Sequence, residues 1–531
     1  MSRFSASIAS FCWLMSIQII PATADSTQPG LGRLTHEAET VLVILHTNDF
    51  HGHVTAWQGW EGELAGKTIG GFARLAAAVK SARQNAEHVL LLDAGDAVAD
   101  SMISKETRGG AVIRLMNALQ YDAMAIGNHE FDFGEERLRV LIGEARFPVL
   151  AANIRVRGTG NLFALPYIIR QLGPLQIGIL GMAYPNTSLT TIKNNVPDLE
   201  FEEAAPVARR FIQQMRDEGA GTVIVLSHLG LDADIQLAKN VPGIDVIVGG
   251  HSHNRMTEAK HIGDTLIVQA GAHGSDLGVL ELMFHGTQRT RSTYHLLTLD
   301  HALIKADPHM TAQLAGLTAQ LLPPSENTPV GHGRNWLIRA QTLAGTEPRL
   351  RNQESPADSL FADIIRESTK ADVAFLPGIG YGVGIPPGVI STKALINLIP
   401  HESHIFIMEM NGAQLLEILE QSLENIYTGD PAKKVGGMIQ VSGLTFTYDP
   451  QGQVGGRVHS ASVNGKPFDA QARYRVATNS LLAEGGFNYG TFRTITSQAD
   501  LGSQFEMIEG WMRRHPGITA LTPGRIRQTS H

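Results

Sequence analysis

The sequence is almost without cysteine: Cys12 is the single one among 531 residues. One cysteine excludes a disulfide framework within the chain and any cysteine-rich zinc module. Charges of both signs are nearly balanced, with 43 Lys and Arg against 51 Asp and Glu and a net charge of −8. The chain therefore lacks the basic field by which proteins hold nucleic-acid polymers. Internal repeats, low-complexity tracts and charge blocks are also missing, which argues against a disordered or fibrous protein.

The composition that remains is typical of a well-packed globular protein. Hydrophobic residues make up 43% of the chain and charged residues 18%, with 55 Gly and 24 Pro. At roughly 150 residues per domain this length allows about three domains, and two large ones fit as well. The 21 histidines are the unusual feature, because histidine is the commonest metal ligand among side chains.

The first residues are typical of a secretory signal. A short basic start precedes the apolar stretch Ile8–Ile20, and an Ala-x-Ala motif ends at Ala24, so we expect a signal peptide at 1–24. A membrane anchor is the alternative, but the stretch is shorter than the roughly 20 residues that a spanning helix needs. Lipid modification of Cys12 is a further alternative that the bulky Phe11 disfavours. We expect an exported, periplasmic monomer without a membrane anchor and, once cleaved, without cysteine.

Between residues 41 and 300, short apolar runs alternate with amphipathic segments. Runs this short and this rich in Val, Ile and Leu are typical of strands covered on both faces. Phe72–Arg83 and Val112–Leu119 read as intervening helices, and some antiparallel pairing is expected near Val279–Met283. The pattern predicts α/β layers. The runs are Val41–Leu45, Val89–Leu92, Met124–Ile126, Val149–Ala151, Ile177–Leu180, Val223–Leu226, Val246–Val248 and Leu266–Val268.

The pattern changes after Asp300. Ala302–Leu321 reads as a helix, which the pair Pro323-Pro324 ends. A second region of mixed helices and strands follows from Glu354 to Phe492, and Gln504–Arg514 reads as a closing helix. The chain is therefore predicted to have two domains.

Polar clusters follow five of the apolar runs. In open α/β sheets, ligands collect at the carboxyl ends of the strands, so these clusters can converge although they lie far apart in sequence. The clusters are Asp49-Phe50-His51, Gly95-Asp96, Gly127-Asn128-His129-Glu130-Phe131-Asp132, Ser227-His228 and Gly249-Gly250-His251-Ser252-His253.

The residue types in these clusters fit two divalent metal ions. Asp49 and His51 are two residues apart, so an extended backbone would point both to one side, and His251 and His253 repeat the spacing. Asp96 is the natural candidate for a carboxylate that bridges the two ions. A metal pair can clamp a phosphoryl group, lower the pKa of a bound water and stabilise both the attacking and the leaving oxygen. A mixture of His, Asp and Asn admits manganese, zinc, iron or cobalt.

Taken in this order and followed by a second domain, the clusters resemble the bacterial 5′-nucleotidase family. The resemblance covers about 41–525 and implies an N-terminal four-layer αββα metallophosphatase sandwich, here at 41–300. It further implies a helical linker at 301–345 and a smaller α/β substrate-binding domain at 346–525.

The resemblance also assigns roles to single residues. It implies one metal held by Asp49, His51, Asp96 and His253. It implies a second held by Asp96, Asn128, His228 and His251. His129, oriented by Asp132, would stabilise charge on the phosphoryl group or protonate the leaving oxygen, because a carboxylate partner favours the charged imidazole.

Other readings of single residues stay open. An Asp after a strand is often a helix N-cap, which would account for Asp49 or Asp96 taken alone. His46, His53 and His273 match no ligand position, and we expect them to lie behind the ligands or at the surface.

The second domain departs from the family where nucleotides are held. The family usually carries an Asn-Gly-Gly-x-Arg segment, whereas Leu376–Gly382 contains no arginine to fork onto phosphate oxygens. Two aromatic rings sandwich the base in the family, and here the aligned positions are Val441 and Leu481. Phe487, at the position of the usual Asp, is with Tyr489 either a displaced platform or a core aromatic. Further candidates for contact with an anionic substrate, or else solvated surface residues, are His401, His404, Lys433 and Lys434.

The sequence therefore predicts an exported dinuclear-metal phosphohydrolase that cleaves phosphate esters or anhydrides. Nucleotides lead as substrates, with an activity of the 5′-nucleotidase, UDP-sugar hydrolase or 2′,3′-cyclic phosphodiesterase type, and Mn or Zn leads over Co or Fe. One alternative is a sulfate thiohydrolase-like enzyme acting on a carrier-bound thiosulfonate, for which the altered segment Gly378–Gly384 leaves room. The other is a non-catalytic metal-containing binding protein, which would have no need of His129 and Asp132.

Overall fold

The computed structural model describes residues 39–322, 324–339, 351–379, 382–515 and 517–529, which are joined by contacts into one unit. The predicted signal peptide at 1–24 and part of the predicted linker lie outside the described residues. Within those ranges, every helix is too short or too polar to cross a bilayer.

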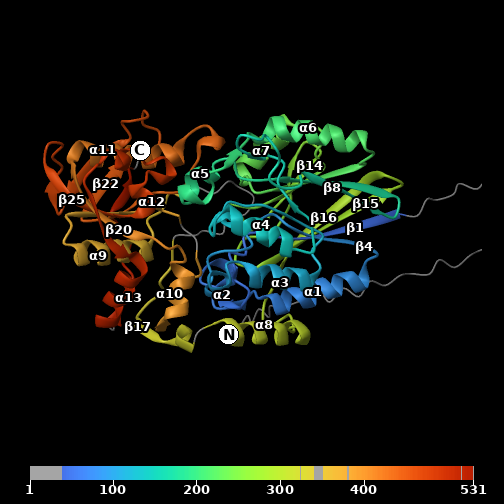
Figure 1. The fold of residues 1–531 in the computed structure, drawn as a ribbon, viewed down its shortest axis with the longest axis horizontal. Helices are drawn as coiled ribbons and strands as arrows, with labels where there is room; N and C mark the ends of the chain where they lie inside the picture. Colours follow the sequence, from blue (N-terminus) through green and yellow to red (C-terminus); the bar gives the residue numbers. More distant parts are fainter. Residues whose placement is uncertain (1–38, 323, 340–350, 380–381, 516, 530–531) are drawn as a thin grey trace, which may run out of the picture. The chain divides into compact units, whose positions relative to one another are not determined.

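Two six-stranded sheets form the centre of the first region (Figure 1). The first has the order β16-β15-β1-β4-β5-β6, in which β1, β4, β5 and β6 pair in parallel, while β15 pairs antiparallel with both β1 and β16. The antiparallel pairing expected near Val279–Met283 is thus confirmed. The strands are β1 Glu39–Thr47, β4 His88–Asp93, β5 Ala123–Ala125, β6 Val149–Leu150, β15 Asp276–His285 and β16 Gln288–Thr298.

The second sheet has the order β13-β14-β12-β11-β9-β8, with a parallel centre and an antiparallel strand at each edge. Its strands are β8 Tyr167–Leu172, β9 Leu175–Met182, β11 Thr222–Ser227, β12 Val246–Gly249, β13 Lys260–Ile262 and β14 Thr265–Val268. Two short pairs lie in the connections: β2 Trp57–Gln58 with β3 Thr68–Ile69, and β7 Ile154–Val156 with β10 Leu199–Phe201.

Helices cover the outer face of each sheet, which gives the predicted four layers. In Figure 1 α1 and α3 lie below the strands, and α6 and α7 lie above them. The helices of this region are α1 Phe72–Asn85, α2 Met102–Thr107, α3 Gly110–Leu119, α4 Glu135–Glu144, α5 Thr187–Thr190, α6 Ala204–Asp217, α7 Leu231–Asn240 and α8 Pro308–Leu321.

Strand β1 shows why the apolar runs are continuous rather than alternating. Leu42 and Ile44 pack into the core between the two sheets, while Val43 and Leu45 pack into the core beneath the helices. Successive side chains of a strand point to opposite faces, so a strand buried on both faces needs an apolar residue at every position.

The helix predicted over residues 302–321 begins later than expected. The structure starts α8 at Pro308, with Asp307 as N-cap, whose carboxylate accepts a hydrogen bond from the backbone N–H of Met310 at 2.9 Å. Proline at the first helical position and an Asp before it are strong start signals, and they outweigh the apolar periodicity upstream.

The second region is built around a five-stranded sheet of order β21-β18-β25-β20-β26. Helices α9, α10 and α13 pack on one face and α11 on the other. Its strands are β18 Val373–Leu376, β20 His404–Asn411, β21 Gln440–Ser442, β25 Arg473–Asn479 and β26 Gln498–Ser503. Its helices are α9 Pro356–Thr369, α10 Thr392–Leu398, α11 Gly412–Tyr427, α12 Ser480–Ala483 and α13 Gln504–Arg514.

Two small sheets complete this region. One has the order β19-β17-β27, with β17 Pro329–Gly333, β19 Gly388–Ser391 and β27 Gly517–Ile518. The other has the order β24-β23-β22-β28, with β22 Leu444–Tyr448, β23 Val458–Val463, β24 Lys466–Pro467 and β28 Ile526–Gln528. The predicted α/β architecture with two domains is confirmed.

Candidate functional site

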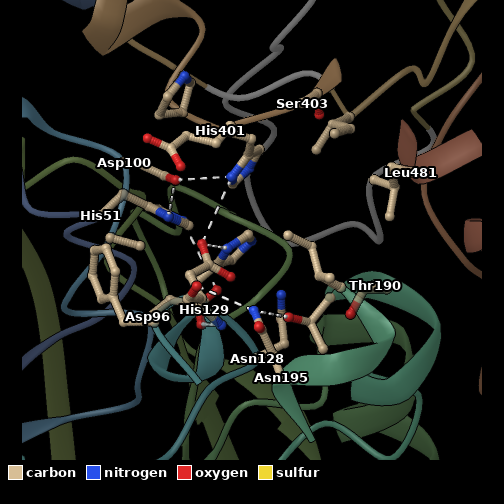
Figure 2. A pocket seen from close by; sticks show the side chains of 18 of the residues that line it. His51, Asp96, Asp100, Asn128, His129, Thr190, Asn195, His401, Ser403 and Leu481 are labelled. Carbon is tan, nitrogen blue, oxygen red and sulfur yellow. Dashed lines mark hydrogen bonds and ion pairs between the residues drawn. The ribbon is translucent and has the colours of Figure 1, made fainter. Parts of the chain in front are cut away.

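The loops after β1, β4, β5 and β12 meet at one cavity of about 570 Å³. Figure 2 shows side chains from several of these loops converging on it. Asp49 and His228 are fully buried. Asp49 contacts His253, and His228 contacts Asp96. The other predicted metal and dyad residues all line the cavity: His51, Asp96, Asn128, His129, Asp132, His251 and His253.

Three of the predicted ligands form a first group of donors. Nε2 of His253 lies 3.2 Å from Oδ1 of Asp49 and 3.0 Å from Nε2 of His51. Nε2 of His51 lies 3.8 Å from Oδ1 of Asp49 and 3.9 Å from Oδ2 of Asp96. The donor atoms of Asp49, His51 and His253 lie within 4.8 Å of one another. Nitrogen and carboxylate oxygen donors this close together fit a single divalent ion.

A second group of donors shares Asp96 with the first. Nε2 of His228 lies 2.9 Å from Oδ2 of Asp96, and Nδ1 of His251 lies 3.0 Å from Oδ1 of Asn128. Asp96, His228 and His251 offer donor atoms within 4.8 Å of one another. Because one oxygen of Asp96 faces both His51 and His228, the arrangement suits a carboxylate shared by two ions.

The backbone around these residues is not extended, so that part of the sequence interpretation is wrong. Asp49 and His51 have φ of 52° and 49°, and His251 and His253 have φ of 69° and 57°. Asp96 has φ of 55°. Left-handed backbone is uncommon for residues other than Gly, and it concentrates at functional sites where surrounding structure enforces it. Here tight turns, rather than an extended strand, bring alternate side chains to one point.

Glu130 holds two of the ligand loops together, a role that the sequence did not reveal. One carboxylate oxygen accepts from the backbone N–H of Gly127 at 2.6 Å and of Asp96 at 2.9 Å. The other accepts from Ala97 at 2.8 Å and from Val98 at 3.3 Å. The loops after β4 and β5 are therefore joined through one buried side chain, and the only signal was an acidic residue within the cluster.

His129 and Asp132 form the expected pair at the cavity. Nδ1 of His129 lies 2.8 Å from Oδ2 of Asp132, and the backbone N–H of His129 donates to Oδ1 of Asp96 at 2.8 Å. Burial alone would lower the pKa of His129, but the carboxylates of Asp132, Asp96 and Asp100 outweigh it and hold this pKa well above its usual value. The imidazole is therefore suited to carry a positive charge and a transferable proton.

The charge balance at the donors follows from burial and from the shared carboxylate. Burial by itself would raise the pKa of Asp96, but the charge of His228 and then of His129 outweighs it and lowers this pKa. Burial opposes charge on His228 as well, yet Asp96 raises its pKa to about 9. The pKa of His51 and of His251 lies well below its usual value, chiefly because of burial. The neutral imidazoles of His51 and His251 are therefore in the protonation state that metal binding requires, whereas His228 would give up its proton when an ion binds.

Arg351 supplies a cation that the sequence analysis did not find. Its Nη2 donates to the backbone oxygen of His251 at 3.1 Å, and its side chain lines the cavity. Leu376–Gly382, where the family usually has an arginine, contributes none. An arginine in the irregular stretch just before α9 carries no sequence signal for a binding role.

Asp100 and His401 are two further cavity residues that sequence reasoning missed or left at the surface. Oδ2 of Asp100 lies 2.5 Å from Nδ1 of His51, and Oδ1 lies 3.6 Å from Nδ1 of His401. The ring of His401 stacks on that of His129, with centroids 5.2 Å apart and an interplanar angle of 11°. His401 is therefore a cavity residue that comes from the second region of the chain (Figure 2).

The predicted base-binding residues separate into two sets. Leu481 and Phe487 line the cavity. Val441 lies in β21 with no exposed surface and packs in the core of the second region, so it does not line this cavity. Tyr489 is also a core residue.

The remaining candidates for anion contact lie elsewhere. His404 pairs with Asp500 at the surface, and Lys434 pairs with Asp232. Lys433 is exposed, near Asp430.

The three histidines without a predicted ligand position are all buried, which excludes the surface alternative. His53 and His273 contact each other, with ring centroids 4.8 Å apart, and His273 lies 5.7 Å from the ring of His51. These two lie behind the first donor group. His46, in β1, instead stacks on Tyr294, with ring centroids 5.8 Å apart.

Two family models match most of the described chain. Residues 42–255 match the calcineurin-like phosphoesterases, and residues 331–494 match the 5′-nucleotidase C-terminal domain. The chain is 27% identical to a snake venom 5′-nucleotidase of Naja atra over 91% of its own length and 98% of that protein. It is 26% identical over 92% of its length to a trifunctional nucleotide phosphoesterase protein of Bacillus subtilis, and it spans 35% of that longer protein.

Two solved structures share the fold over nearly the whole chain. A 5′-nucleotidase precursor from Thermus thermophilus is 26% identical with a TM-score of 0.83, over 92% of this chain and all of that one. A sulfate thiohydrolase from Thermus thermophilus has a TM-score of 0.82 over 95% of this chain and 98% of that one. Its 23% identity is a likeness in fold alone. The resemblance drawn from the sequence clusters is confirmed.

Proposed function

Because the chain belongs to the 5′-nucleotidase family of metallophosphatases, we propose that it hydrolyses phosphate esters or anhydrides of nucleotides. Membership makes it a metal-dependent phosphoester hydrolase with divalent cofactors. The proposal for nucleotides rests on the full-length relatives, whose names state 5′-nucleotidase. Its domains would be 41–300, a linker at 301–345 and 346–525.

We assign the metals to the two donor groups described above. Asp49, His51, His253 and Asp96 would hold one ion, and Asp96, Asn128, His228 and His251 the other. The observation that carries this assignment is Oδ2 of Asp96, which faces a histidine of each group. Nitrogen and oxygen donors in this mixture fit Mn or Zn first and admit Co or Fe. Bound ions would polarise the phosphoryl group and activate the attacking water.

The residues of the chain complete the chemistry around that centre. His129, kept in its charged form by Asp132, would stabilise the negative charge that develops on the phosphoryl oxygens or give its proton to the leaving oxygen. Arg351, which lines the cavity beside His251, would hold a phosphate oxygen in place of the arginine missing from Leu376–Gly382. Leu481 and Phe487 would bury the base by apolar contact.

We further propose that the protein works outside the cytoplasm, after cleavage near Ala24, as a monomer without a membrane anchor. The apolar stretch Ile8–Ile20 and the Ala-x-Ala motif support this location.

Phosphate release by residues 25–531 tests the function. The protein is stripped of metal, reloaded with Mn, Zn or Co, and given nucleoside mono- and triphosphates, UDP-sugars, 2′,3′-cyclic nucleotides and an aryl phosphate. We expect metal-dependent release with a nucleotide preference, and we expect Asp96→Ala to abolish it because both metal sites lose a ligand.

Other outcomes separate the alternatives. Release from the aryl phosphate alone would contradict the nucleotide assignment and leave the metal centre standing. Nucleotide binding without turnover, unchanged by His129→Ala, would mark a binding protein. No release from any phosphate, together with cleavage of a thiosulfonate, would favour the sulfur chemistry suggested by the similarly folded thiohydrolase.

A further inference from the structure

We propose that Asp100 is a positioning residue, whose carboxylate holds the imidazole of His51 so that its opposite nitrogen faces the metal. The inference rests on the proposed function in that it takes His51 to be a metal ligand.

The His51 ring is in contact on both of its nitrogens. Nδ1 lies 2.5 Å from Oδ2 of Asp100, and Nε2 lies 3.0 Å from Nε2 of His253 and 3.8 Å from Oδ1 of Asp49. The side chains of Asp100 and His51 are each 1% exposed, so water does not compete for this contact. A carboxylate on one side favours a proton on Nδ1 and leaves Nε2 as the nitrogen that offers its lone pair to a metal.

His228, in the other donor group, repeats the arrangement with a different acceptor. Its Nδ1 lies 2.8 Å from the backbone oxygen of Ala94, and its Nε2 lies 2.9 Å from Oδ2 of Asp96. In metal sites the ligating histidine generally gives its second N–H to a carbonyl or a carboxylate, which fixes tautomer and ring orientation. Asp100 is the carboxylate form of that device in this chain.

The backbone places Asp100 with little freedom. Ser101, the next residue, is the N-cap of α2, and its hydroxyl donates to the backbone oxygen of Gly52 at 2.6 Å. Gly52 in turn follows His51 and donates its N–H to the backbone oxygen of Ala97 at 2.9 Å. The loop of His51 and the loop of Asp100 are therefore tied together on both sides of the contact.

Asp100 itself has a left-handed backbone, which is strained for a residue other than Gly. Its φ is 55°, in the left-handed region that favours Gly, and Ala99 before it has φ of 78°. A glycine would fit this backbone more easily, yet the residue present has a carboxylate that reaches His51.

The second oxygen of Asp100 faces His401 from the other region of the chain. Oδ1 lies 3.6 Å from Nδ1 of His401. Figure 2 shows Asp100 between His51 and His401, with dashed lines to both. His401 therefore limits rotation of the carboxylate, which keeps Oδ2 directed at His51.

Metal affinity measured without substrate tests the proposal. The metal-free wild type and Asp100→Ala, which removes the acceptor that faces Nδ1 of His51, are titrated with Zn²⁺ and with Mn²⁺ against a chromophoric chelator. We expect a fall of about 10–100-fold in affinity at one of two sites, the size typical for loss of such an outer partner. Turnover should recover in large part at saturating metal, because no ligand has been removed. Glu402→Gln is the matched control: this carboxylate also lines the cavity but pairs with Lys105 at 2.8 Å, and its variant should keep wild-type affinity.

Asp100→Gly keeps the test decisive if the Ala variant fails to fold. Glycine removes the carboxylate and relieves the left-handed backbone, so the metal-free variant should melt at a higher temperature than wild type and still lose metal affinity. Wild-type affinity at both sites in either folded variant overturns the proposal. Two-site metal binding without any hydrolysis by wild type would instead overturn the proposed function and leave the role of Asp100 intact.

Discussion

His129 lies among carboxylates, and their negative charge favours the protonated form of its imidazole. Asp132 contacts its Nδ1, while Asp96 and Asp100 add negative charge nearby. A ring nitrogen of His129 also lies within 4.8 Å of donor atoms of His51 and Asp96. We expect the site to use the charge of His129 rather than a lone pair.

We therefore expect His129→Gln to lower turnover while both metals stay bound. A positioned general acid is worth about 10²–10⁴-fold in rate, so kcat should fall by that factor with KM little changed. Metal content, measured by elemental analysis alongside kcat, makes the check. Loss of one metal from the variant would show that His129 is a ligand.

Glu130 accepts hydrogen bonds from backbone N–H groups of the loops, as a capping side chain does at the N-terminus of a helix. Its two oxygens collect four backbone N–H groups from the loops after β4 and β5. These loops follow parallel strands, whose pairing ends at Asp93 and Ala125. Beyond these residues, Glu130 rather than a neighbouring strand accepts from the four backbone N–H groups. The placement of Asp96 therefore depends on a side chain 34 residues away in sequence.

Replacing Glu130 with Gln should destabilise the fold and disturb the shared ligand. The amide nitrogen of Gln cannot accept, so at least one buried N–H of Asp96, Ala97 or Gly127 loses its acceptor. An unsatisfied buried donor costs about 1–3 kcal/mol. Denaturant unfolding of metal-free Glu130→Gln should show that loss, and Glu136→Gln, at an exposed position of α4, should not. An unfolding free energy equal to wild type would contradict the role.

Burial of acidic groups makes the stability of the folded protein depend on pH. Asp234, in α7, accepts a hydrogen bond from Ser227 at the end of β11 and has no exposed surface. Burial raises the pKa of Asp234 to about 8, against the smaller opposing effects of Ser227 and His228. The folded state therefore binds a proton more tightly than the unfolded chain does.

The sign of the effect follows from this difference in pKa. The stabilising contribution is fully present below the unfolded value near 3.8 and is lost as pH rises through about 8. We expect the melting temperature of the metal-free protein to fall between pH 5 and 8, and Asp234→Asn to show a weaker fall because it cannot titrate. Melting curves at several pH values measure it. Equal slopes for the two proteins would mean that Asp234 is ionised in the folded state.

Much of this architecture was predictable because it depends on local patterns. The buried apolar runs predicted the strands. The polar residues that follow these runs predicted the donor residues, since parallel strands bring their carboxyl ends to one edge of the sheet. The left-handed turns at Asp49 and His251 were not predictable, because neither sequence position holds the Gly that normally signals them.

Contacts between distant segments were equally hidden. Arg351, Asp100 and His401 reach the cavity from separate places in the chain, and each sits in a stretch without periodicity. The alignment placed Val441 at a base-binding position. An alignment shift of one residue, however, moves a β-strand side chain to the opposite face of the sheet. In this structure it faces the core.

The hold of Glu130 on backbone amides involves no metal-binding atom of any residue, and this has a consequence for activation. The ligand loops can be folded before any ion arrives, so an apoenzyme would take up its ions by simple binding rather than by a folding step. The rate of activation should then rise in proportion to the free ion concentration. Chelation should silence the enzyme reversibly, and activity should return on re-addition without a refolding delay. The free ion concentration around the protein would then determine the active fraction, regardless of earlier cycles of metal loss.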